Sequence, residues 1–427
     1  MSKKMLSWLL VGTMVGLLTS FVCPIAVQGQ TTLTFIGQTG PRYGFAVKGI
    51  ADAYVKLNPD VDVVIESYPW EEWATKIALD VAGGGGAYDI IWIDYKFIGG
   101  YADAGYLLPL DAYLLQDSEF WQDIQSDIYD VVLGMYKYKD QWWAIPHDGN
   151  SQVFYYRQDV LDDAGVKVPT SWEEVFAVAP KIHNPPSFYA AGANLKRFWA
   201  ADVWYAPFMS AGGYFWDENY VPAIDTPAGV EAAELLLKLT KFCPPDAIGW
   251  AEADLYEAMG TAGVVGMAPN QWAGNVLTNP EAAKLANKIG VALPPSLKGK
   301  RVLPMGGYGL GINTKSYYKD QAWDFIKFYT GRENQQLLVA HTGQPARISA
   351  LTDPVNVAKS RYFSVLAKSL EYAIPRPVIA EFSIVENIVG VELNKMMLGE
   401  KTPAEAVRDA NTEVYKVMRG RIEQSQK

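Results

Sequence analysis

The segment from residue 33 to residue 94 restricts the fold more than any other part of the sequence, because strand and helix patterns alternate along it. Residues 33–37 and 61–68 have strand patterns, and residues 89–94 form the continuous apolar run of a strand buried on both faces. Apolar residues recur at helical spacing over 47–57 and 69–81, between these strands. This β-α-β-α-β order predicts a doubly wound α/β unit.

The rest of the chain continues the alternation and contains clear helix starts. Thr170 to Glu173 and Thr402 to Glu405 match the capping-box pattern, and Thr226-Pro227 is a cap followed by proline at the first helical position. A glycine-rich strand over 307–313 precedes a helix over 320–331. With 427 residues at about 150 per domain, we predict an α/β protein of two or three domains.

The first 29 residues have the order of an export signal. Lys3-Lys4 precede an apolar run from Met5 to Val22, and cleavage is expected after Gly29. An uncleaved membrane anchor is disfavoured, because serines and threonines interrupt a run that only approaches the roughly 20 residues needed to span a bilayer. Lipid attachment at Cys23 is disfavoured as well, because the lipoprotein cleavage motif requires a small residue directly before the cysteine, and Val22 stands there. We therefore predict a periplasmic or other extracytoplasmic protein.

Composition excludes several classes of function. The formal net charge is −10 and no block rich in lysine and arginine occurs, so no nucleic-acid partner is expected. Three histidines and two cysteines leave little material for metal binding, and we predict neither a metal nor a cofactor. The glycines at 83–86 and 307–311 lack the spacing of phosphate-binding loops. Aromatic residues are abundant, with 14 Trp, 25 Tyr and 16 Phe, so ring stacking is a recognition chemistry that the chain can supply.

The most specific stretch is Tyr-Lys-Asp-Gln-Trp-Trp-Ala-Ile-Pro at 138–146. A strand pattern that ends Tyr-Tyr-Arg-Gln-Asp-Val-Leu follows at 155–161, and Pro-Thr-Ser-Trp-Glu-Glu follows at 169–174. Five further segments agree with the same family in order: 89–107, 263–272, 306–312, 322–326 and 343–347. The ordered set resembles the extracytoplasmic solute-binding proteins of ABC importers, family one, of the carbohydrate-binding type. Departures are minor, such as Asp140-Gln141 where Gly-Lys is usual.

This resemblance implies two α/β lobes with a ligand cleft between them, joined by strands that cross from one lobe to the other. Carried over to this chain, lobe one is 30–146 plus 302–345, and lobe two is 147–301 plus 346–427. The lobes are expected to close around the ligand by hinge motion. The resemblance also implies a non-enzymatic, monomeric receptor that binds a sugar or polyol and delivers it to the membrane permease of an ABC importer.

A sugar requires polar groups at its edge and aromatic planes against its faces, and loops after parallel strands collect such groups. The candidates on this basis are Gln38, Thr39, Arg42, Tyr43, Asp94, Asp148, Asn150, Trp272, Tyr308 and Arg347. The resemblance places Trp272 against a sugar face and Asp94 on hydroxyl groups. The sequence does not choose between Asp148 and Asn150, and for Arg347 an ordinary ion pair is an equal alternative. We expect Trp199, Trp204 and Trp216 to lie in the hydrophobic core, although one of them can instead line the ligand pocket.

Two other functions compete with this interpretation. A secreted glycoside hydrolase would share the aromatic residues and paired carboxylates, and the separation of the carboxylates that distinguishes it is not readable from sequence. A ferric-iron binder that uses Tyr155 and Tyr156 is disfavoured, because the required histidine and acidic partners are not evident. The size, charge and identity of the ligand stay open.

Overall fold

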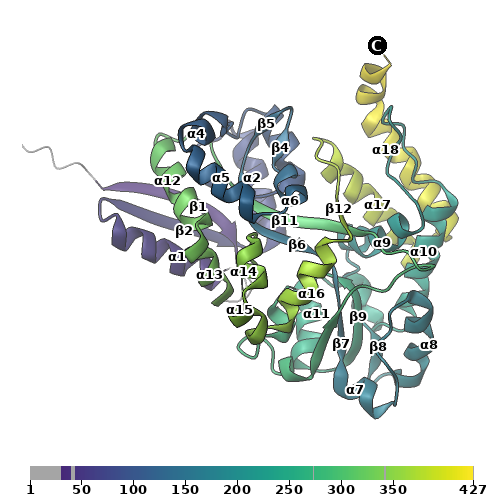
Figure 1. The fold of residues 1–427 in the computed structure, drawn as a ribbon. Helices are drawn as coiled ribbons and strands as arrows, with labels where there is room; N and C mark the ends of the chain where they lie inside the picture. The colour runs from purple at the N-terminus through teal and green to yellow at the C-terminus, as the bar shows by residue number, and fades with distance from the viewer. Residues whose placement is uncertain (1–29, 40–43, 273, 341–342, 427) are drawn as a thin grey trace, which may run out of the picture.

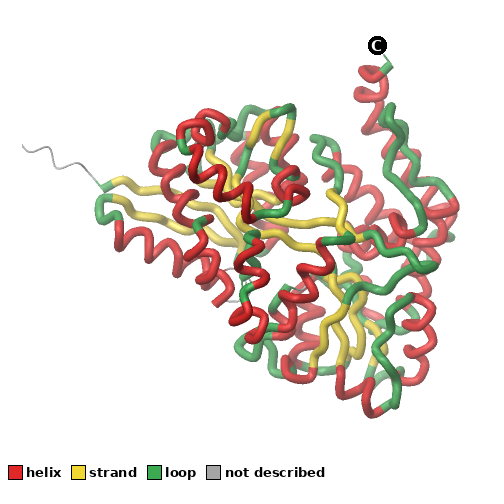
Figure 2. The backbone as a smooth tube through the Cα atoms, in the orientation of Figure 1, coloured by secondary structure: helices red, strands yellow, loops and turns green. Residues whose placement is uncertain are grey.

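The computed structural model describes residues 30–39, 44–272, 274–340 and 343–426 (Figure 1). The predicted export signal, residues 1–29, lies outside these ranges. Helices surround two large sheets, which Figure 2 shows as two groups of strands. The predicted two-lobed α/β fold is therefore confirmed. None of the described helices is both long and apolar enough to cross a bilayer.

The first lobe is built on a six-stranded sheet. Its order is β12-β11-β3-β1-β2, with β6 also paired to β11. The strands are β1 (Thr31–Gln38), β2 (Val61–Tyr68), β3 (Ile90–Asp94), β6 (Ile145–Ser151), β11 (Leu303–Ile312) and β12 (Ala373–Pro375). Strand β1 pairs in parallel with both β2 and β3, as the alternation at the start of the sequence predicts. Every residue of β3 is buried, which explains its continuous apolar pattern.

Helices of the first lobe come mainly from the N-terminal third of the chain. They are α1 (Gly44–Leu57), α2 (Trp70–Ala82), α3 (Ile98–Asp103), α4 (Asp111–Gln116), α5 (Ser118–Asp127), α6 (Asp130–Gly134), α12 (Lys319–Thr330) and α13 (Arg332–Ala340). A short 3-10 turn, η1 (Tyr95–Phe97), follows β3 directly, and a two-stranded hairpin joins β4 (Lys137–Tyr138) to β5 (Gln141–Trp142).

The second lobe is built on a four-stranded sheet with the order β10-β7-β9-β8. Its strands are β7 (Val153–Arg157), β8 (Tyr189–Ala191), β9 (Val265–Gln271) and β10 (Ile289–Ala292). The longer helices of this lobe are α8 (Trp172–Ile182), α9 (Phe198–Ser210), α10 (Pro227–Thr240), α16 (Arg361–Leu370), α17 (Phe382–Met397) and α18 (Pro403–Ser425). Shorter helices and turns complete it: α7 (Gln158–Asp163), α11 (Glu252–Leu255), α14 (Ile348–Thr352), α15 (Pro354–Lys359), η2 (Pro245–Gly249), η3 (Tyr256–Thr261), η4 (Val276–Thr278) and η5 (Ala286–Lys288).

Two long strands connect the lobes, and they correct the predicted boundaries. Strand β6 pairs with β11 as far as Ser151, so the chain leaves the first sheet after this residue and not at Pro146. Strand β12 lies in the range assigned to lobe two, yet it pairs in parallel with β11 of the first sheet. The sequence of β6, Ile-Pro-His-Asp-Gly-Asn-Ser, contains proline, glycine and polar residues that are rare in strands, which is why its pattern did not predict one.

The helix starts agree with the predicted caps, with one shift of a single residue. Thr402 and Glu405 form a capping box at α18, and the Thr226 hydroxyl caps α10. At α8 the cap is Ser171 and not Thr170: its hydroxyl accepts the Glu174 N–H, and the Glu174 carboxylate accepts the Thr170 N–H at 2.7 Å. Reciprocal caps of this kind satisfy N–H groups that a helix leaves without partners.

Candidate ligand-binding cleft

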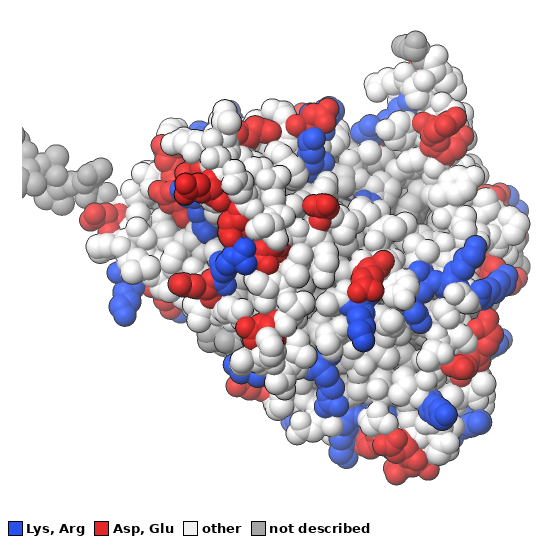
Figure 3. All heavy atoms as spheres, viewed as in Figure 1, with Lys and Arg blue, Asp and Glu red and all other residues white. Residues whose placement is uncertain are grey.

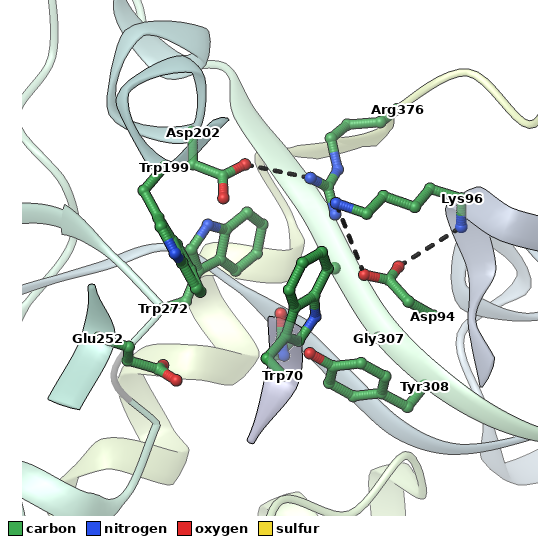
Figure 4. Close-up of a pocket in the computed structure, with 12 residues that line it drawn as sticks. Trp70, Asp94, Lys96, Trp199, Asp202, Glu252, Trp272, Gly307, Tyr308 and Arg376 are labelled. Atoms are coloured by element: carbon green, nitrogen blue, oxygen red, sulfur yellow. Dashed lines mark hydrogen bonds and ion pairs between the residues drawn. The ribbon is translucent and has the colours of Figure 1, made fainter. Parts of the chain in front are cut away.

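A hollow lies where the two lobes meet, and both lobes contribute to its walls (Figure 4). Its lining residues are Trp70, Asp94, Lys96, Asn150, Trp199, Asp202, Glu252, Trp272, Gly306, Gly307, Tyr308 and Arg376. The cavity volume is about 40 Å³, so the walls stand close together in this structure. Charged and aromatic side chains from both lobes line the cavity, as they commonly do in sites for small molecules. The hollow is therefore a candidate site for a small molecule.

The first lobe supplies a buried carboxylate at the end of β3. Asp94 is 5% exposed, and its side chain accepts a hydrogen bond from the backbone N–H of Lys96 at 3.4 Å. The Lys96 ammonium lies 3.8 Å from the other carboxylate oxygen. Burial raises the pKa of Asp94, although Lys96 and Arg376 oppose this rise. The result is a hydrogen-bond acceptor in a nearly water-free wall, where a bond to a hydroxyl group is stronger than in solvent.

Aromatic planes form much of the remaining wall. Trp199 and Trp272 come from the second lobe and stand opposite Asp94 and Tyr308 in Figure 4. Trp70, at the start of α2 in the first lobe, meets Trp199 across the cleft with ring centroids 6.1 Å apart. The guanidinium carbon of Arg376 lies 5.3 Å from the ring centroid of Trp272. These planes and the carboxylates beside them suit a ligand that has apolar faces and a polar edge.

Charged groups of opposite sign gather at one side of the hollow. Arg376 donates to Asp202 at 3.1 Å and to Glu386, on α17 behind the wall, at 2.7 Å. Lys96 is paired with the same Glu386 carboxylate. Burial raises the pKa of Asp202 to about 7, although Arg376 opposes the rise. Three carboxylates, counting Asp94, thus surround two cations in a region shielded from water.

Four of the predicted site residues line the hollow: Asp94, Asn150, Trp272 and Tyr308. Asp148 does not line it. It lies fully buried beneath the floor and accepts a hydrogen bond from the Asn150 side-chain amide at 3.1 Å. Of the two candidates that the sequence left equal, Asn150 lines the hollow, and Asp148 accepts from its amide behind the lining.

The loop after β1 contributes less than predicted among the described residues. Gln38 is buried at the end of β1, Thr39 is exposed, and neither lines the hollow. Arg42 and Tyr43 lie outside the described residues.

Arg347 is a correction, because it does not line the hollow. It is 1% exposed, and its guanidinium pairs with Asp123 at 2.7 Å and Asp127 at 3.2 Å, both on α5. It also donates to the backbone carbonyl of Thr330 at 2.8 Å. These partners fix Arg347 as a link between α5, the end of α12 and the chain before α14. The structure therefore contains the ion pair that was the alternative to ligand binding for Arg347.

Sequence reasoning missed or underrated the side chains of six residues of the hollow: Trp70, Lys96, Trp199, Asp202, Glu252 and Arg376. It also did not name the two lining glycines, Gly306 and Gly307, as site residues. Two of the six had a local signal, because Trp70 follows the end of β2 and Lys96 comes two residues after Asp94. Trp199 belonged to a tryptophan cluster expected in the core, where Trp204 does lie, fully buried and stacked on Phe208. Arg376 reaches the hollow from a short strand near the C-terminus, and no local pattern indicates that.

We expect Arg347→Met to reduce stability and leave ligand affinity unchanged. The substitution leaves Asp127 buried with one cation fewer, and breaking a buried ion pair costs about 3 to 5 kcal/mol. We expect a loss near 3 kcal/mol, because Arg332 still pairs with Asp127 at 2.7 Å. Denaturant unfolding measures the loss, and Arg332→Met, at a more exposed position, serves as the smaller-effect control. If Arg347→Met weakened ligand affinity and left the unfolding midpoint unchanged, Arg347 would instead be a ligand-binding residue.

Asp202→Asn should change how stability depends on pH. The folded-state pKa of Asp202 is about 7 against an ordinary value of 3.8, so the folded protein holds a proton more tightly than the unfolded chain. The stability from that proton is present below about pH 4 and is lost as the pH rises to about 7. Unfolding curves should show wild type losing up to about 4 kcal/mol relative to the variant over this range. Parallel curves for the two proteins would contradict the shifted titration.

Comparisons with known sequences identify the family. Residues 39–336, more than half of the chain, match the family of the bacterial extracellular solute-binding protein. A probable amino-acid ABC transporter periplasmic-binding protein of Sinorhizobium fredii is 25% identical over 87% of this chain and 84% of its own length. The mannitol-binding protein of Pseudomonas aeruginosa is 20% identical over 93% of this chain and 95% of its own length.

Solved structures agree with the sequence comparisons. An ABC transporter solute-binding protein from Agrobacterium radiobacter K84, in complex with ribitol, has a TM-score of 0.81 at 27% identity and covers 90% of this chain and 98% of its own. A maltose-bound protein of T. maritima has a TM-score of 0.83 at 22% identity, covers 90% of this chain and 99% of its own, and supports the fold alone. The chain belongs to the bacterial extracellular solute-binding protein family.

Proposed function

We propose that this protein captures a small sugar or polyol in the cleft between its lobes and delivers it to the membrane permease of an ABC importer. It acts outside the cytoplasm as a monomer, after removal of the export signal, and it catalyses no reaction. The observation that carries this proposal is the joint presence of aromatic planes and buried carboxylates in one hollow lined by both lobes.

Each part of the hollow matches a part of a polyhydroxyl ligand. Trp199 and Trp272 offer planes for the C–H faces, and Asp94 and Asp202 offer acceptors for hydroxyl protons. Cations in the same wall, Arg376 among them, are donors for hydroxyl oxygens. The solved structure of a relative in complex with ribitol supports a polyol as the ligand, and so does the name of the mannitol-binding relative.

Surface charge supports a small-molecule ligand and not a nucleic acid. Figure 3 shows lysines and arginines interspersed with aspartates and glutamates over the visible face, without a continuous basic area. The formal net charge of −10 adds to this argument, since a polyanion would meet overall repulsion.

A thermal-shift panel tests the proposal. The mature chain is heated with ribitol, D-mannitol, D-tagatose or maltose, and in parallel with amino acids, because one relative is named as an amino-acid binder. A ligand at 100 times its dissociation constant adds about 2.7 kcal/mol of stability, which raises the melting temperature measurably. We expect at least one sugar or polyol to do so and to be recovered unchanged. Stabilisation by amino acids alone would contradict the proposal, and conversion of a bound sugar would favour the hydrolase.

Trp272→Ala should weaken binding of the tightest sugar in that panel by about 2 to 4 kcal/mol, because it removes a stacking plane. Calorimetric titration measures the affinity of the folded fraction, and a melting curve measures stability separately. Trp216→Ala is a matched control, since this half-buried tryptophan of the same lobe does not line the hollow. Intact affinity in the Trp272 variant would contradict a stacking role.

A further inference from the structure

Glu386 is a buried carboxylate that binds two cations of the cleft without lining the cleft itself. It lies on α17 and is 2% exposed. One of its oxygens accepts from the Lys96 ammonium, and the other accepts from Arg376 at 2.7 Å. The hydroxyl of Tyr205 also donates to it, at 3.3 Å. Lys96 and Arg376 both line the hollow, so one carboxylate sets the positions of both.

The groups around Glu386 belong to different parts of the fold. Lys96 is in η1, directly after β3 of the first sheet, and Arg376 follows β12, which pairs with β11. Helix α17 packs mainly on α9 and α18 of the second lobe. The chain just before α17 also packs tightly on the first lobe, because a Cβ at Gly99 of α3 would lie only 2.9 Å from the backbone nitrogen of Ala380. Glu386 therefore joins the two lobes beside the crossing strands.

Electrostatics explains why this carboxylate matters. Lys96 and Arg376 are 3% and 6% exposed, and their charged groups lie side by side in Figure 4. Two adjacent cations in a medium of low dielectric constant repel each other strongly unless an anion lies between them. Burial alone would raise the pKa of Glu386, but Lys96 and Arg376 hold it below its ordinary value. The carboxylate stays ionised, and the two cations stay together.

We propose that Glu386 is a positioning residue that couples lobe closure to the binding site. It aims Lys96 and Arg376 at the ligand when the lobes are together, and its pairing with Lys96 favours that arrangement. The role in binding rests on the proposed function, because it assumes a ligand in this cleft.

The same helix offers a matched control. Glu392 is 6% exposed and pairs with Lys395 at 2.7 Å and with Lys401, all within the second lobe. Glu392→Gln therefore removes a comparable carboxylate from α17 without touching the cleft or the first lobe. Glu386→Gln keeps the size and shape of the side chain, removes its charge and leaves one accepting oxygen where the carboxylate has two.

Calorimetric titration with the tightest binder among ribitol, D-mannitol, D-tagatose and maltose tests the positioning role. We expect Glu386→Gln to raise the dissociation constant at least tenfold with unchanged stoichiometry, and Glu392→Gln to stay within twofold of wild type. A merely structural role would instead reduce the stoichiometry, which reports the folded fraction, and keep the dissociation constant. A Glu386→Gln constant within twofold of wild type would overturn the proposal.

A double-mutant cycle tests whether Glu386 acts through Lys96. In a Lys96→Met background, Glu386→Gln should raise the dissociation constant clearly less than the tenfold expected in wild type. The reason is that Lys96, one of the two cations that Glu386 positions, is no longer present. If the losses of binding free energy from the two substitutions are fully additive, Glu386 does not act through Lys96, and this part of the proposal is overturned.

Small-angle X-ray scattering without any sugar tests the link between the lobes. Glu386→Gln should have a larger radius of gyration than both wild type and Glu392→Gln, because the attraction to Lys96 is lost. An unchanged radius would overturn the coupling to closure. If wild type binds none of the four sugars, the proposed function fails, and this scattering comparison still decides the role of Glu386 in holding the lobes together.

Discussion

The antiparallel pairing of β6 with β11 is the interaction on which the rest of the structure depends, because these strands connect the lobes and form the floor of the cleft. It sets Asn150 opposite Gly306 and Asp148 opposite Tyr308. The packing there is close, since a Cβ at Gly306 would lie 2.2 Å from the Asn150 side-chain oxygen and 2.7 Å from the Trp272 ring. Glycine at this position therefore allows the floor to meet the aromatic wall of the second lobe.

Charge placement around this floor follows from the meeting of the lobes. The first lobe brings Asp94 and Lys96, the second brings Asp202 and Glu386, and Arg376 enters between them. Each cation has a carboxylate partner, so the cluster tolerates burial. Burial, and to a smaller extent the neighbouring Glu386 carboxylate, raises the pKa of Asp202. A ligand with many hydroxyl groups would find donors and acceptors already oriented, which reduces the cost of ordering them on binding.

Local patterns in the sequence predicted the parts of the fold that local chemistry determines. The parallel strands β1, β2 and β3 and the helices between them follow hydrophobic periodicity. The same patterns indicated Asp94 at the end of β3 and Trp272 directly after β9, whereas Tyr308, expected in a strand-end loop, lies in the middle of β11 and still lines the hollow. Strand β6 was missed because its polar and glycine residues pair only when β11 is beside it. Arg376 meets Asp202 through tertiary folding alone, and no local signal exists for such a pair.

A crystal structure of the mature chain grown with its tightest-binding sugar or polyol tests the central claim most directly. The account predicts density for that ligand between Trp199 and Trp272 on one side and Asp94 and Tyr308 on the other, with Lys96 and Arg376 still paired to Glu386. Density for the sugar at another surface, with these side chains making no contact to it, would contradict the account.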